Sequence, residues 1–163
     1  MAEDILVDHT ESFSSFSHIV DARILRALAD QGFARPTLVQ AKAIPLALEG
    51  RDILARARTG SGKTAAYCIP IVQKILNVKL VGVLRSCSVL SLDFARLKSI
   101  QSICTADLSK QVTRAIILVP TRELAEQVSN YLKTLLKYCE GITSVNAAAG
   151  ATTHLQRCVD LVY

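Results

Sequence analysis

The stretch Ala57-Arg58-Thr59-Gly60-Ser61-Gly62-Lys63-Thr64 decides the fold of this 163-residue chain. It follows the run 52–56, which favours a short strand, and it precedes an apolar segment with helical spacing through about Leu76. A strand, a glycine-rich turn and a helix in this order form a phosphate-binding loop, because the glycines let backbone amides approach a phosphate at a helix N-terminus. The sequence therefore predicts an α/β fold with a nucleotide-binding loop.

The residues of this loop differ in the chemistry that they supply. The amides of 60–64 can form an anion-binding nest. Lys63 can supply a positive charge for the β- and γ-phosphates, and Thr64 can supply a hydroxyl for Mg²⁺. Ala57 stands where the general pattern has glycine, and for Arg58 we favour a solvated side chain over a phosphate partner. The alternative for the whole stretch is a chance glycine turn before a helix. We predict that residues 57–64 hold a triphosphate, with Lys63 and Thr64 as catalytic residues.

A second block, residues 32–40, indicates which base the nucleotide carries. A glutamine amide such as that of Gln40 carries one donor side and one acceptor side, which match N7 and N6 of adenine. An aromatic ring such as Phe16 can cover a base with its face. Taken alone, Gln40 would be an exposed glutamine on a helix. Together with the phosphate loop it predicts ATP with Mg²⁺ as the ligand.

The block 32–40 resembles the Q motif of DEAD-box RNA helicases, a resemblance that extends over about 16–76 and 110–163. In that family the glutamine recognises adenine and an upstream aromatic residue packs near the base. Phe16 lies one position short of the usual spacing, and Phe13 is the alternative. The resemblance implies that these residues contact ATP: Phe16, Phe33, Pro36, Thr37 and Gln40.

The stretch Pro120-Thr121-Arg122-Glu123-Leu124-Ala125 resembles motif Ia of the same family. There, a strand-to-helix turn holds the RNA backbone through helix-terminal amides and the arginine, which agrees with the affinity of both groups for phosphate. For Arg122 the alternative is a surface ion pair with Glu123 or Glu126. The RNA-binding residues that the resemblance implies are Pro120, Thr121, Arg122, Glu123 and Gly150, the last of which could equally be a plain turn.

The order of elements predicts a parallel sheet covered by helices on both faces. We expect strands at 52–56, 114–119, 142–147 and 160–163. We expect helices from Asp21 to Gly32, over 37–49 with Pro45 as a possible kink, over 63–76, and from Thr121 to Gly141. With the resemblance, this is a partial RecA-like P-loop domain. It comprises a flexible acidic tail over 1–15, an incomplete N-terminal RecA-like domain over 16–163, and an atypical insertion or linker over 77–109.

Charge and cysteine content limit the class of protein. Residues 1–30 carry a net charge of −4, whereas the whole chain carries +5, so the body is basic and favours polyanionic partners. Five scattered cysteines without metal-ligand spacing predict reduced thiols in an intracellular protein. An acidic N-terminus without an apolar core argues against a signal peptide, and we expect neither a membrane span nor secretion.

The resemblance implies an ATP-dependent RNA helicase, an ATP hydrolase whose partners are RNA and ATP. The sequence around the loop is most similar to the nucleolar branch of the family, which acts in large ribosomal subunit assembly. This resemblance implies a nuclear or nucleolar location, pre-ribosomal particles as partners and a monomeric protein. The Asp-Glu-Ala-Asp sequence does not occur in the chain, so we expect a helicase fragment that shows no ATPase by itself. The alternatives are a non-catalytic fragment that binds nucleotide or RNA and, more remotely, another P-loop ATPase.

Overall fold

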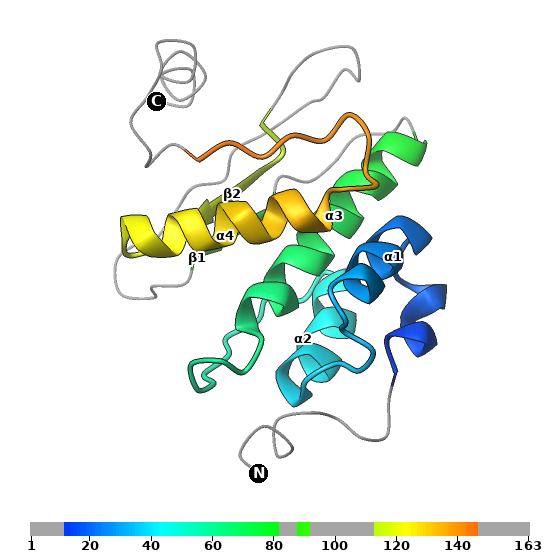
Figure 1. The fold of residues 1–163 in the computed structure, drawn as a ribbon, viewed down its shortest axis with the longest axis horizontal. Coiled ribbons are helices and arrows are strands. Elements are labelled where there is room, and N and C mark those ends of the chain that lie inside the picture. The colour runs from blue at the N-terminus through cyan, green and yellow to red at the C-terminus, as the bar shows by residue number, and fades with distance from the viewer. Residues whose placement is uncertain (1–11, 82–87, 92–112, 147–163) are drawn as a thin grey trace.

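The structure is a computed structural model that describes residues 12–81, 88–91 and 113–146 (Figure 1). Its central element is helix α3, which contacts both α2 and α4, while α1 contacts α4 and the short helix η1. The elements in chain order are η1 (Phe13–His18), α1 (Ala22–Asp30), α2 (Leu38–Leu48), α3 (Lys63–Val81), β1 (Ser88–Ser91), β2 (Ala115–Leu118) and α4 (Arg122–Leu135).

The prediction of a loose tail over 1–15 is wrong for residues 12–15, and residues 1–11 lie outside the described part. Residues 13–18 form the 3₁₀ helix η1, which Ser12 caps by accepting a hydrogen bond from the amide of Ser14. Residues three apart lie on the same side of a 3₁₀ helix. Phe13 and Phe16 therefore both reach the core, and their burial holds this segment on the domain.

The predicted helices after Asp21 and Thr37 are confirmed as α1 and α2. Asp21 accepts a hydrogen bond from the amide of Arg23, and Gly32 follows the end of α1 with a φ of +78°. Thr37 forms a capping box with Gln40, in which each side chain bonds to the other residue's amide. Helix α2 continues through Pro45 to Leu48.

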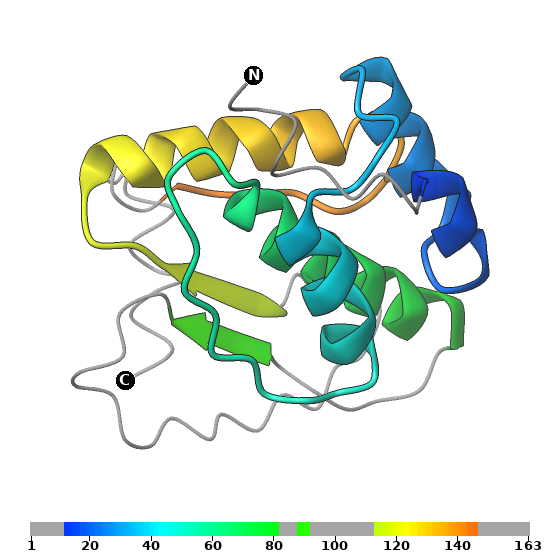
Figure 2. The ribbon, with the colours of Figure 1, turned by 90° about the horizontal axis from the view of Figure 1, so that it is seen from below.

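The predicted parallel sheet is confirmed by β1 and β2, which pair in parallel with Ser88 opposite Ala115. Strand β2 is the strand expected at 114–119. Strand β1 and the last turn of α3 lie within 77–109, the range predicted as an atypical insertion or linker. In two views α4 runs along the sheet, over one of its faces (Figures 1 and 2).

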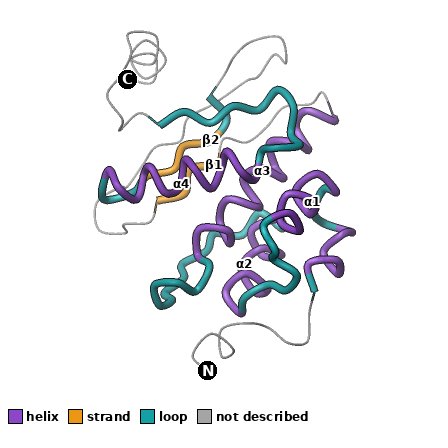
Figure 3. The backbone as a smooth tube through the Cα atoms, viewed as in Figure 1, coloured by secondary structure: helices purple, strands orange, loops and turns teal. Residues whose placement is uncertain are grey.

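Two predicted strands are not strands in the structure. Residues 52–56 and 142–146 are loop segments, shown in teal in Figure 3. A strand requires a neighbour that pairs with its backbone groups, and an apolar pattern reports burial but not pairing. Leu54 is 76% exposed, so this segment is not even buried. Ala147 and the fourth candidate, 160–163, lie outside the described residues.

The core lies between α3 and the helices around it. Burial raises the pKa of Cys68 to about 12, and both Cys68 and Cys139 are buried in the core. In the part of the chain that the structure describes, no helix combines the length and apolarity of a membrane span, and no three His, Cys, Asp or Glu side chains gather as ligands for a metal ion. The largest fully buried apolar side chains include Ile24, Leu28, Ile44, Ile69, Leu76 and Leu135.

Candidate functional site

The phosphate loop is a tight turn that leads into α3. Gly60 and Gly62 have φ values of +81° and +79°, which side chains other than glycine rarely adopt. The amide of Ser61 donates to the carbonyl of Arg58 at 3.3 Å, and the amide of Ala66 donates to the carbonyl of Gly62 at 3.2 Å as the helix begins. The two glycines thus turn the chain so that α3 starts directly after the loop.

The ammonium group of Lys63 lies within this loop. Its Nζ donates to the carbonyls of Ala57 and Arg58, at 2.6 Å in both cases. These carbonyls offer the lysine the oxygen contacts that phosphate oxygens offer in a nucleotide complex. The lysine is therefore already inside the loop, and a bound triphosphate competes with two backbone carbonyls for its hydrogen bonds.

Thr37 and Gln40 tie the predicted adenine-binding block directly to the loop. The hydroxyl of Thr37 donates to the carbonyl of Ser61 at 2.9 Å. The Gln40 amide accepts from the amide of Thr37 at 2.9 Å and donates to the carbonyl of Gly62 at 3.1 Å. Gln40 is 7% exposed, so the structure does not leave it as a free helix glutamine. Residues more than 20 positions apart in sequence thus form one hydrogen-bonded unit.

The aromatic residues proposed to cover adenine differ in exposure. Phe16 and Phe13 are each 5% exposed and pack edge to face with ring centroids 6.1 Å apart. Phe33 is 47% exposed, whereas Pro36 is fully buried. Neither buried ring offers its face to solvent here, so the assignment of Phe16 or Phe13 as the adenine cover stays a prediction that requires the ring to leave its core contact.

The position of Thr64 fits the role of a magnesium ligand. Thr64 lies in the first turn of α3, next to Lys63. Burial raises the pKa of Tyr67 to about 12, while a hydrogen bond with Thr64 acts in the opposite direction. The hydroxyl of Ser61 is buried without a hydrogen-bond partner among the described residues. The loop therefore combines glycine turns, a lysine and the hydroxyls of Thr59, Ser61 and Thr64, a donor set that fits a triphosphate with Mg²⁺.

The predicted RNA-binding turn lies at the start of α4. The hydroxyl of Thr121 accepts from the amide of Leu124 at 3.3 Å, and the side chains from Pro120 to Glu123 are exposed. In the part of the chain that the structure describes, no ion pair joins Arg122 to Glu123 or Glu126. The turn thus presents a cation beside a helix N-terminus. Gly150 lies outside the described residues.

Comparisons with known proteins agree on one family. The model for DEAD/DEAH box helicases matches residues 37–160. The chain is 52% identical, over 92% of its length, to the ATP-dependent RNA helicase DBP9 of Cryptococcus neoformans and 43% identical, over 96%, to that of Aspergillus terreus. It spans about a fifth of the length of these curated relatives (21%). A crystal structure of the RNA helicase Prp28 of Chaetomium thermophilum bound to ADP is 25% identical, with a TM-score of 0.53 over 86% of this chain and 27% of that one.

Proposed function

Since the chain belongs to the DEAD/DEAH box helicase family, we propose that it is the ATP-binding part of an ATP-dependent RNA helicase. The observation that carries this proposal is the contact of the Gln40 amide with the carbonyl of Gly62. It places a group suited to adenine on the loop suited to the phosphates. The family model matches residues 37–160, and the fold is a partial RecA-like α/β domain.

The remaining hydrogen-bonding capacity of Gln40 supports adenine as the base. A glutamine amide has two N–H donors and an oxygen that accepts two hydrogen bonds. Gln40 uses one donor for Gly62 and one acceptor site for the amide of Thr37. One donor and one acceptor site remain, which match N7 and the N6 amino group of adenine. Guanine has an oxygen in place of that amino group, so its O6 would face the glutamine oxygen.

The wild-type chain should therefore bind ATP about tenfold more tightly than GTP, because one lost hydrogen bond in a desolvated site costs roughly 1.4 kcal/mol. Gln40→Leu should remove most of this preference. Gln31→Leu is the matched control, since Gln31 only bonds to the carbonyl of Ala27 within its own helix. Fluorescence titration with labelled ATP and GTP measures both affinities. Equal affinities of the wild-type chain for the two nucleotides would reject the proposal.

In this proposal each loop residue acts on the triphosphate in a defined way. The backbone amides of 60–64 bind phosphate oxygens, Lys63 exchanges its carbonyl contacts for the β- and γ-phosphates, and Thr64 supplies a hydroxyl ligand for the cation. The magnesium ion, when bound, neutralises the charge that develops on the phosphates. Thr37 and Gln40 bond to the carbonyls of Ser61 and Gly62 and so position the base-recognising block over the loop.

We further propose that the turn at Thr121 and Arg122 binds one RNA phosphate. Arg122→Gln should weaken binding of single-stranded oligouridine by about three- to tenfold and lower the salt dependence by about 0.7 in logarithmic slope, as expected for one lost phosphate contact. Lys133→Gln is the control, because it removes the same charge from the exposed C-terminal turn of α4. Filter binding at several salt concentrations measures both quantities. The same loss in both variants would indicate that only net charge matters.

The biological setting follows from the resemblance to the nucleolar branch of the family. We propose RNA within pre-ribosomal particles as the substrate, a nucleolar location and a monomeric protein. The similarity to helicases named DBP9 supports this assignment. Co-sedimentation of the tagged protein with pre-ribosomal particles is the expected result, and its recovery only in free fractions would contradict it.

A further inference from the structure

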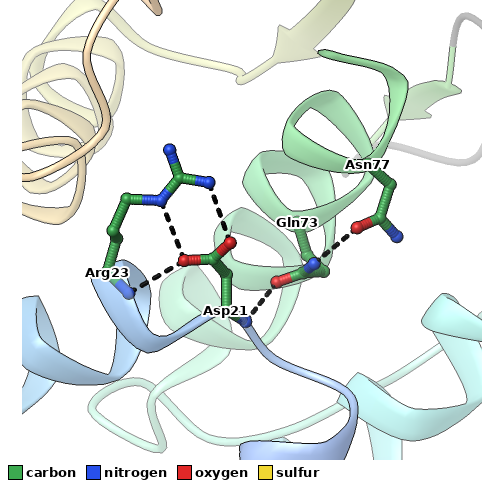
Figure 4. A network of polar contacts seen from close by, with 4 residues as sticks. All are labelled: Asp21, Arg23, Gln73 and Asn77. Atoms are coloured by element: carbon green, nitrogen blue, oxygen red, sulfur yellow. Dashed lines mark hydrogen bonds and ion pairs between the residues drawn. The ribbon is translucent and has the colours of Figure 1, made fainter. Parts of the chain in front are cut away.

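Helix α3 carries a buried polar side chain, Gln73, on the face that packs against the N-terminal segment. Only 5% of Gln73 is exposed to solvent. A buried amide is unfavourable unless its hydrogen bonds are made. Both ends of this amide are bonded: its Oε1 accepts from the backbone amide of Asp21 at 2.6 Å, and its Nε2 donates to Oδ1 of Asn77 at 2.7 Å (Figure 4).

Asp21 is itself held in a fixed orientation. Its carboxylate accepts from the amide of Arg23 at 2.9 Å and from the guanidinium of Arg23 at 2.9 and 2.8 Å (Figure 4). The side-chain hydrogen bond with Arg23 lowers the pKa of Asp21. The carboxylate is thus fully engaged by its own helix, and the contact with α3 is made by the Asp21 backbone alone. Gln73 therefore holds the chain at the junction between η1 and α1 through one hydrogen bond to the backbone.

The N-terminal segment with η1 makes a second set of hydrogen bonds, with the loop that leads into the block 32–40. The amide of Phe13 and the hydroxyl of Ser12 both donate to the carbonyl of Ala34, at 3.2 Å each. Three residues later, Thr37 begins the contacts with the phosphate loop. These hydrogen bonds, together with the chain that joins Asp21 to η1 and Ala34 to Thr37, connect α3 through Gln73, η1 and Gln40 to the phosphate loop, which leads back into α3.

We propose that Gln73 is a positioning residue for nucleotide recognition. By fixing the N-terminal segment on α3 it sets where the Thr37–Gln40 block lies over the loop, and hence where the Gln40 amide meets the base. It lies ten residues from Lys63 and acts only through these connections. The inference rests on the proposed binding of ATP, and it concerns the base rather than the phosphates, because the loop leads directly into the helix that carries Gln73.

The test compares Gln73→Met with Asn77→Ala in the 163-residue chain. Methionine fills the site but leaves the amide of Asp21 without an acceptor, whereas Asn77→Ala removes only the outer hydrogen bond. We expect Gln73→Met to reduce the ratio of ATP to GTP affinity by about three- to tenfold, the factor expected from misplacing one base contact. Affinity for inorganic tripolyphosphate, which has no base, should stay within about twofold, and Asn77→Ala should resemble the wild type.

A purely structural role would lower the melting temperature without changing this ratio, so an unchanged ratio in folded Gln73→Met overturns the proposal. An equal loss of tripolyphosphate affinity overturns it as well. If the methionine variant does not fold, Gln73→Leu supplies the same comparison. The wild-type chain is titrated first: failure to prefer ATP there overturns the proposed function, and this inference with it, before any variant is made.

Discussion

Replacing Lys63 with alanine is expected to weaken ATP binding by about 10- to 100-fold, because a hydrogen bond from a charged group contributes about 1.5–3 kcal/mol. The ammonium group lies inside the loop, bonded to the carbonyls of Ala57 and Arg58. A bound triphosphate would replace these two carbonyls, and the positive charge of Lys63 would then lie beside its most negative end. Alanine leaves the backbone amides of the loop as the remaining donors for the phosphates.

The control for this prediction is Lys42→Ala. Lys42 is exposed on α2, two positions beyond Gln40, so its removal changes the net charge equally without touching the loop. Isothermal titration with ATP and Mg²⁺ measures both variants, and circular dichroism checks that they fold. Similar ATP affinities for the Lys63 and Lys42 variants would show that the triphosphate does not bind at this loop.

Local features of the sequence predicted the parts of the site that depend on nearby residues. The glycine turns, the start of α3 at Lys63 and the start of α2 after Thr37 each involve residues within a few positions of one another, and all are present. Turn and cap chemistry is local, so a single sequence contains it. The strand at 114–119 was predictable for a similar reason, since its apolar run is short and bounded by Pro120.

Features that depend on distant partners could not be predicted in the same way. The run 52–56 has a strand-like composition but lacks a paired neighbour, and Leu54 is exposed. Phe13 was assigned to a tail because its core contacts lie far along the chain. Gln73 looks like an ordinary helix glutamine until the fold brings it to Asp21, 52 positions away. The contact of Gln40 with Gly62 likewise appears only in three dimensions, although both residues were predicted to bind the same ligand.

Gly62→Ala should have a larger effect than any other glycine substitution in the loop. A Cβ at Gly62 would overlap Nε2 of Gln40 and would lie 3.1 Å from Oγ1 of Thr37. The amide of Gln40 would have to move away and would lose its hydrogen bond to the loop. Gly60 provides a matched control, because its φ is nearly the same but a Cβ there meets nothing within 4 Å. Both alanines incur the cost of a left-handed backbone, about 1–2 kcal/mol, so the difference between them isolates the contact with Gln40.

The central claim is that base recognition and phosphate recognition share one hydrogen-bonded unit. Measuring the affinities of Gly62→Ala and Gly60→Ala for ATP and for GTP tests it most directly, because both substitutions lie in the phosphate loop and neither residue is expected to touch the base. We predict that Gly62→Ala abolishes the preference for ATP while Gly60→Ala keeps it, even if both bind more weakly than the wild type. The same ATP preference in both variants would contradict the claim.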